Sequence, residues 1–144
     1  MPTAIEGLEA ARELISDEAR WTSGTFARAV DGTPSHPSDP EACRWCAHGA
    51  IRRTFDRGTG PVGSDPEFAH ACSVLDAAAR ELYGANSPAI EMAAGSWSYI
   101  GVNDVLGHRA VLQVYDRAIA RLKASSRPRS SPLSCWILYH HEFP

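Results

Sequence analysis

The sequence predicts a mainly α-helical fold: a compact four-helix domain with one short β-hairpin between the first two helices and an irregular C-terminal tail. Apolar residues recur at three- and four-residue steps in several long segments. An Asp-Gly pair at 31–32 follows a β-prone run and is typical of a hairpin turn. We therefore expect one globular domain over residues 1–124, followed by a linker and aromatic tail over 125–144, extended or partly disordered.

Composition narrows the classes of function. A chain of 144 residues with 44% hydrophobic and 22% charged residues can bury the core of one ordinary domain. Its net charge of −3 provides no overall positive field for nucleic acid or acidic membranes. No apolar run approaches the roughly 20 residues of a membrane span, and the acidic N-terminus is unlike a signal peptide. We expect a cytoplasmic protein with reduced cysteines.

The first helix is predicted over residues 3–16, with Ala4, Leu8, Ala11 and Ile15 on one face. Residues 21–30 change to β-prone types and lead into the Asp-Gly turn. Residues 33–37 then hold two prolines, so any returning strand is an edge strand or an extended arm.

The second helix is predicted from about residue 39 to 56. Ser38 and Glu41 form an S-x-x-E capping box at its start. Its inner face carries small residues such as Gly49 and Ala50, which let another backbone approach closely. We expect this helix to be central, with the other three packed on it.

Two further helices complete the predicted domain. Ser64 and Glu67 form a second capping box, and the helix that they start runs to Tyr83. Residues 88–94 can form one or two helical turns, and residues 95–102 read as a loop or short strand. Asn103 and Asp104 then form a cap or turn before a last helix over 106–124.

Several short motifs follow one another along the chain: W-T-x-G at 21–24, A-R at 27–28, D-G at 31–32, D-P at 39–40, R-W-C-A at 44–47, G-A-I at 49–51, N-D at 103–104 and D-x-A-I at 116–119. Together these motifs resemble a small family of bacterial and phage proteins that carry a domain of unknown function. The resemblance covers roughly residues 5–124 and implies no established activity, so no functional residue is transferred. This chain has Val102 where the family pattern has tryptophan, and Cys43 where an apolar residue is usual.

Cysteine and histidine residues raise the possibility of a zinc site. Cys43 and Cys46 form a C-x-x-C pair, and His70 with Cys72 forms H-x-C. His48 lies two residues after the first pair. The alternative is that these cysteines are small buried side chains in helices, as free cysteines commonly are. We favour the alternative and expect neither a metal nor another cofactor.

Cysteine catalysis is the second possibility. Cys46 with Asp104 and His108 supplies the residue types of a nucleophile, an orienting acid and a base. A nucleophilic cysteine needs a nearby cation or helix N-terminus. The predicted second helix places Cys46 two turns from its start, so a non-catalytic protein is favoured over an enzyme.

A polar cluster in the resembling segments gives the third possibility. Its arginines could bind a carboxylate or phosphate on a tryptophan platform. The alternative, which we favour, is a structural Arg–Asp pair under an indole. The candidate residues are Trp21, Thr22, Arg28, Arg44, Trp45, Asn103 and Asp104, and Arg44 is the first to test.

The C-terminal region is locally basic and gives the fourth possibility, weak nucleic-acid binding. We expect its cations to form a solvated surface instead, because no nucleic-acid-binding motif accompanies them. The sequence as a whole predicts a small binding or interaction protein without catalysis, associated with phages or mobile elements. Its partner, a protein or small molecule, is not identified, and a homodimer is possible. The basic residues of the C-terminal region, on which the nucleic-acid alternative depends, are Arg117, Arg121, Lys123, Arg127 and Arg129.

Overall fold

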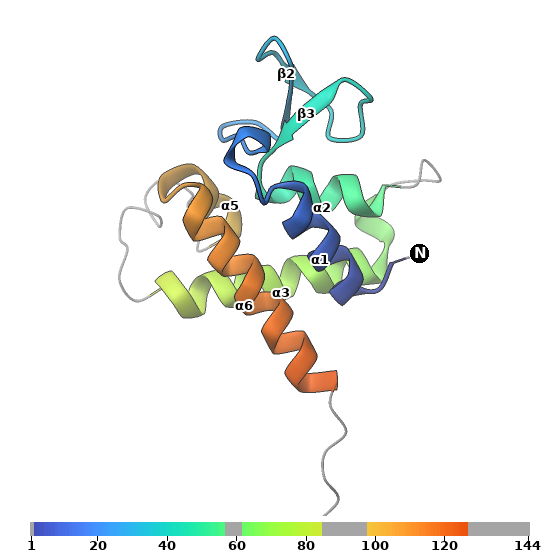
Figure 1. The fold of residues 1–144 in the computed structure, drawn as a ribbon. Helices are drawn as coiled ribbons and strands as arrows, with labels where there is room; N and C mark the ends of the chain where they lie inside the picture. The colour runs from blue at the N-terminus through green and yellow to red at the C-terminus, as the bar shows by residue number, and fades with distance from the viewer. Residues whose placement is uncertain (1, 57–61, 85–97, 127–144) are drawn as a thin grey trace, which may run out of the picture.

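The protein forms a helical body with a small antiparallel sheet at one end (Figure 1). A computed structural model describes residues 2–56, 62–84 and 98–126. The expected mainly helical fold with a small β-structure after the first helix is confirmed in these ranges, but the helix boundaries and the number of strands differ. No helix of the described ranges is long and apolar enough to cross a lipid bilayer.

The first helix, α1, spans Ala4–Leu14, as its apolar spacing predicts. Thr3 caps its first turn in a capping box with Glu6. Leu8, Ala11 and Ile15 are fully buried, so this stripe is the core-facing side. A short 3₁₀ turn, η1 (Glu18–Arg20), then leads to the sheet.

The sheet has three strands, β1 (Ala27–Ala29), β2 (Pro34–Ser35) and β3 (Ala42–Trp45), in the order β2-β1-β3. β1 and β2 form the hairpin predicted around the Asp-Gly turn, where Gly32 has a φ of +87°. β3 was not predicted and pairs antiparallel with the other edge of β1.

The second helix begins later than predicted. α2 spans Ala47–Phe55, and residues 42–45, which the sequence places in a helix, form β3. The expected capping box does not form: the Ser38 hydroxyl donates to Asp56 Oδ2 at 2.5 Å, while the Glu41 amide donates to Asp39 Oδ1 at 3.0 Å. Backbone pairing with β1 therefore overrides a local helix signal.

The small inner face of α2 does accept a close backbone. A Cβ atom on Gly49 would lie 1.8 Å from the carbonyl oxygen of Phe26, so only glycine fits there. The approaching chain comes from the segment before β1 rather than from another helix. α2 packs on α1, α3 and α5, whereas α6 packs mainly on α1, α3 and α5. α6 reaches α2 through Tyr115, whose hydroxyl donates to the Ala47 carbonyl at 2.6 Å.

α3 spans Pro66–Tyr83 after a 3₁₀ turn, η2 (Val62–Ser64). Its cap is Asp65 rather than the predicted Ser64. Glu67 is therefore free of the predicted capping box, and its Oε2 accepts the Ala4 amide at 2.8 Å, which joins α3 to the start of α1.

The last predicted helix, 106–124, corresponds to α6, and a helix that was not predicted, α5, precedes it, so the described residues form five helices rather than four. α5 spans Tyr99–Val105 and α6 spans His108–Ser126, with Gly107 between them at a φ of +92°. The described part of the predicted loop over 95–102 is thus helical from Tyr99, and Asn103 and Asp104 lie inside α5 rather than in a turn. The predictions for residues 88–94 and for the tail beyond Ser126 lie outside the described residues.

Candidate functional site

Asn103 is the centre of the predicted polar cluster. It is 1% exposed, and its Oδ1 accepts from Trp21 Nε1 at 2.8 Å and from the Ala47 amide at 2.9 Å. Its Nδ2 donates to the Thr22 carbonyl at 3.2 Å and to Asp104 Oδ1 at 3.0 Å. One buried amide thus joins α5 to the loop before β1 and to the first turn of α2.

Asp104 stabilises the same loop instead of pairing with an arginine. Its Oδ1 accepts the amide of Gly24 at 3.1 Å, and Gly24 has a φ of +79°. The favoured Arg–Asp pair is therefore wrong for the described residues: neither Arg28 nor Arg44 forms an ion pair with Asp104 there. The motifs W-T-x-G and N-D are instead linked to each other by hydrogen bonds.

Arg28 is half-buried and held by neutral oxygen atoms. Its Nε donates to Thr22 Oγ1 at 2.9 Å, its Nη1 to the Gly32 carbonyl at 2.9 Å and its Nη2 to the Ser23 carbonyl at 3.2 Å. None of these acceptors carries a charge. The guanidinium is therefore fixed in place while its positive charge is not neutralised by a contact within the described residues.

Arg44 lies directly opposite Arg28 in the β1–β3 pairing. Its side chain is exposed and makes no hydrogen bond or ion pair within the described parts of the chain. Residues directly opposite each other in antiparallel strands point to the same face of the sheet. We call Arg28 and Arg44 the arginine pair.

Neither tryptophan is an open platform for this pair. Trp45 is 6% exposed, its Nε1 donates to the Pro37 carbonyl at 3.0 Å, and the Arg53 guanidinium lies over its ring at 5.9 Å from the centroid. Trp21 is half-buried against His108, with ring centroids 5.7 Å apart. The structure therefore separates the predicted cluster into a closed network around Asn103 and an arginine pair on the sheet.

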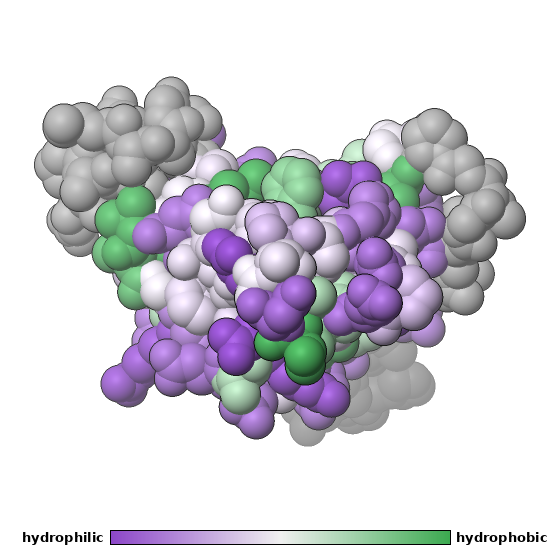
Figure 2. Space-filling view, turned by 90° about the horizontal axis from the view of Figure 1, so that it is seen from above, coloured by the Kyte–Doolittle hydropathy of each residue, from purple (hydrophilic) through white to green (hydrophobic). Residues whose placement is uncertain are grey.

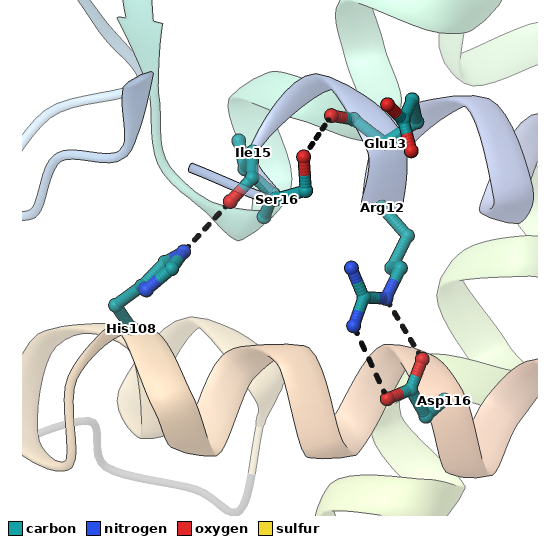
Figure 3. Close-up of polar contacts among 6 residues, drawn as sticks. All are labelled: Arg12, Glu13, Ile15, Ser16, His108 and Asp116. Atoms are coloured by element: carbon teal, nitrogen blue, oxygen red, sulfur yellow. Dashed lines mark hydrogen bonds and ion pairs between the residues drawn. The ribbon is translucent and has the colours of Figure 1, made fainter. Parts of the chain in front are cut away.

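The predicted catalytic set does not assemble as a nucleophile, acid and base. His108 Nε2 donates to the Ile15 carbonyl at 2.7 Å, so its proton is used to bind the end of α1 (Figure 3). Figure 3 also shows the Arg12–Asp116 ion pair, with Arg12 Nε 2.8 Å from Asp116 Oδ1, which joins α1 to α6 further along the helix. His108 and Asp116 thus both fasten α6 to α1.

Cys46 does not lie where the sequence predicts. It is not two turns inside a helix but is the N-cap of α2, where its Sγ accepts the Gly49 amide at 3.2 Å. The thiol is 4% exposed, and burial raises its pKa above the ordinary value. The amides of Gly49 and His48 act in the opposite direction, and the nearby Asp104 adds to the rise.

The cysteines and histidines proposed for zinc do not gather. Cys43 Sγ lies 3.6 Å from the Arg28 carbonyl, and His70 is an exposed residue of α3. No group of three or more His, Cys, Asp or Glu side chains within the described ranges is placed to hold a metal ion.

A partly buried network that the sequence did not reveal joins His48, Tyr99 and Cys72. The Tyr99 hydroxyl lies 2.5 Å from His48 Nδ1 and 3.4 Å from Cys72 Sγ. Burial raises the pKa of both Tyr99 and Cys72 and lowers that of His48, so all three side chains are held in their neutral forms. No sequence spacing links these residues, because they come from α2, α3 and α5.

The basic residues of α6 are largely paired. Arg117 and Arg121 both form ion pairs with Glu81 of α3, and Lys123 Nζ lies 3.4 Å from Glu9 Oε1. Local neutralisation of this kind removes the clustered positive charge that phosphate binding requires. Arg127 and Arg129 lie outside the described residues.

Comparison with known proteins gives a family but no activity. Residues 1–121 match a family of unknown function, DUF6197, and the chain belongs to that family. This agrees with the resemblance to a domain of unknown function. No curated protein and no solved structure matches the chain.

Proposed function

We propose that this protein is a non-catalytic binding protein that recognises a carboxylate- or phosphate-bearing partner through the arginine pair on its sheet. The observation that carries the proposal is the position of Arg28 and Arg44 opposite each other, without a carboxylate contacting either within the described residues. The bacterial and phage-related origin in this proposal rests on the sequence resemblance, and the cytoplasmic location rests on the composition and hydropathy patterns of the sequence.

Electrostatics supports an anionic partner. Two like charges directly opposite each other destabilise an antiparallel pair of strands. An anion placed between the two guanidinium groups would reverse this effect, because arginine binds carboxylate and phosphate oxygens through charge-assisted hydrogen bonds.

The geometry of Arg28 supports recognition by a preorganised group. Three of the five guanidinium N–H groups of an arginine are used by Thr22, Ser23 and Gly32, which leaves two for a partner. Because the side chain is already fixed, binding loses little additional conformational entropy. Arg44 is exposed and can adjust its position to the bound group.

The sheet end of the molecule has features compatible with a protein partner. The face of the molecule in Figure 2, seen from the sheet side of Figure 1, is mostly hydrophilic with small hydrophobic patches. Phe26 is 42% exposed, and the Arg52 guanidinium lies 5.6 Å from its ring centroid. Exposed aromatic and arginine side chains are common at the centres of protein interfaces.

The non-catalytic part of the proposal rests on the environment of the candidate nucleophile. The Cys46 thiol is buried and its pKa is raised, while His108 is used to bind the Ile15 carbonyl. These features oppose formation of a thiolate and proton transfer to that histidine.

The arginine pair can be tested by titrating isotope-labelled protein with inorganic phosphate and, separately, with a glutamate-rich peptide at low ionic strength. We expect amide chemical shifts to change along β1 and β3. Losing one charge-assisted contact of about 1.5 to 3 kcal/mol predicts roughly tenfold or greater weakening in Arg44→Ala.

Arg109→Ala is the matched control, because Arg109 is an exposed arginine at the start of α6. Equal affinities of the two variants, or shifts confined to another surface, would contradict recognition by the arginine pair.

A further inference from the structure

An open cleft lies beside the C-terminal end of α6, between α6, α3 and the first turn of α1. It consists of two adjoining cavities of about 510 and 390 Å³ that share His70, Leu122 and Ser125. The first also borders Val74 and the second borders Ile5. Neither includes the arginine pair, so the inference does not rest on the proposed function.

The floor of the cleft is apolar and its rim is polar. Leu122 is buried, and Ile5 and Val74 are half-buried members of the hydrophobic core that remain partly accessible. His70 and Ser125 are exposed at the rim. An apolar floor within a polar rim is typical of a surface that covers an apolar segment.

The sequence supplies such a segment at the same place. The cleft wall includes Ser125 and Ser126, the last described residues, and eighteen further residues follow in the sequence. Residues 127–132 are polar or proline, whereas residues 133–139 read LSCWILY and are the most apolar stretch of that region. The family match ends at residue 121, so this stretch lies outside the matched residues.

We propose that residues 133–139 dock in this cleft of their own chain. Six residues, 127–132, connect the cleft wall to the apolar stretch and can span up to about 20 Å, which is enough to turn back over α6. A short connection of this kind gives the attached segment a high effective concentration at the cleft. Docking removes the leucine, tryptophan and isoleucine side chains of the stretch from water.

Amide hydrogen exchange of the full-length chain tests the proposal. Residues 133–139 should exchange more slowly in the wild-type protein than in a synthetic peptide of residues 127–144. His70→Asp combined with Ser125→Asp places two charges on exposed rim positions, and should return the exchange of 133–139 to the rate of the peptide. Arg109→Asp changes an exposed residue at the opposite end of α6 and should leave the protection unchanged.

Trp136→Ser provides a second variant that leaves the cleft residues intact. It should also release the segment, while the amides of α3 and α6 keep their wild-type protection. Exchange of 133–139 at the peptide rate in the wild-type protein would overturn the proposal. Protection that persists in the rim variant would place the segment elsewhere, and protection that rises with protein concentration would assign it to the cleft of a second copy.

Discussion

Asn103 should be the polar residue on which folding depends most. Asn103→Ala removes four hydrogen bonds, of which those to the Ala47 amide and the Thr22 carbonyl are fully buried. Each buried polar group left without a partner costs about 1 to 3 kcal/mol. The free energy of unfolding should therefore fall by about 2 to 6 kcal/mol, a large part of the roughly 5 to 15 kcal/mol that stabilises a typical domain.

Urea denaturation followed by circular dichroism measures this loss. With a slope of about 2 kcal/mol/M, in the middle of the usual range for small domains, the unfolding midpoint should fall by roughly 1 to 3 M. Val105→Ala is the control, because Val105 lies in the same helix and is 39% exposed. It should change the stability by less than about 1 kcal/mol. A midpoint for Asn103→Ala that equals that of the control would refute the central role of this side chain.

Asn103→Asp tests the accepting and donating atoms of the Asn103 side chain separately. The new carboxylate keeps the acceptor for Trp21 and Ala47 but loses the donor to the Thr22 carbonyl and to Asp104, whose oxygen lies 3.0 Å from the wild-type amide nitrogen. Burial and the neighbouring carboxylate should raise the pKa of the introduced acid in the folded state. The variant should therefore lose stability as pH rises through that pKa, and a pH-independent deficit would contradict this reasoning.

Three further predictions concern glycine packing, acid stability and thiol reactivity. Gly49→Ala should lower the unfolding free energy by more than about 2 kcal/mol, because the new methyl group would collide with the backbone of Phe26. Gly63→Ala is the control and should be near neutral, because open space surrounds Gly63. Similar urea midpoints for the two variants would contradict this prediction. Burial lowers the pKa of His48 below its usual 6.5, so the folded state binds fewer protons than the unfolded state. The free energy of unfolding should therefore decline as pH falls below about 6.5. In acid denaturation, His48→Asn should make this decline with pH less steep. Iodoacetamide should modify half-exposed Cys43 before buried Cys46 in the native protein, and peptide mass spectrometry measures this order. Preferential labelling of Cys46 would contradict the prediction and favour the catalytic interpretation.

The sequence predicts the elements whose signals are local. Helix α1 and the Asp-Gly turn follow from apolar spacing and turn chemistry, and the structure has both, although its hairpin is part of a three-stranded sheet. The close backbone approach at Gly49 was also predictable from the small inner face, although not the identity of its neighbour, Phe26. Local patterns specify which residues face inwards, but they do not specify what lies opposite them.

The errors arise where tertiary contacts decide between local alternatives. Ser38 and Glu41 have the spacing of a capping box, yet the Ser38 hydroxyl bonds to Asp56 and the following chain pairs with β1. Asn103 looks like a turn residue, but three partners from distant parts of the chain, together with the adjacent Asp104, hold it inside α5. The contribution of such contacts exceeds the small differences in propensity between helix, strand and turn.

The position of Cys46 illustrates how two opposing effects determine reactivity. A helix N-terminus favours a thiolate, and the amides of His48 and Gly49 lower the pKa of this thiol as that principle requires. Burial of the side chain acts in the opposite direction and is the largest effect, so the pKa is raised. The sequence-based argument against Cys46, its depth within a helix, is wrong because the residue is the N-cap of α2. Its exclusion as a nucleophile now follows from desolvation, which depends on how α2 packs and is invisible in the C-x-x-C spacing.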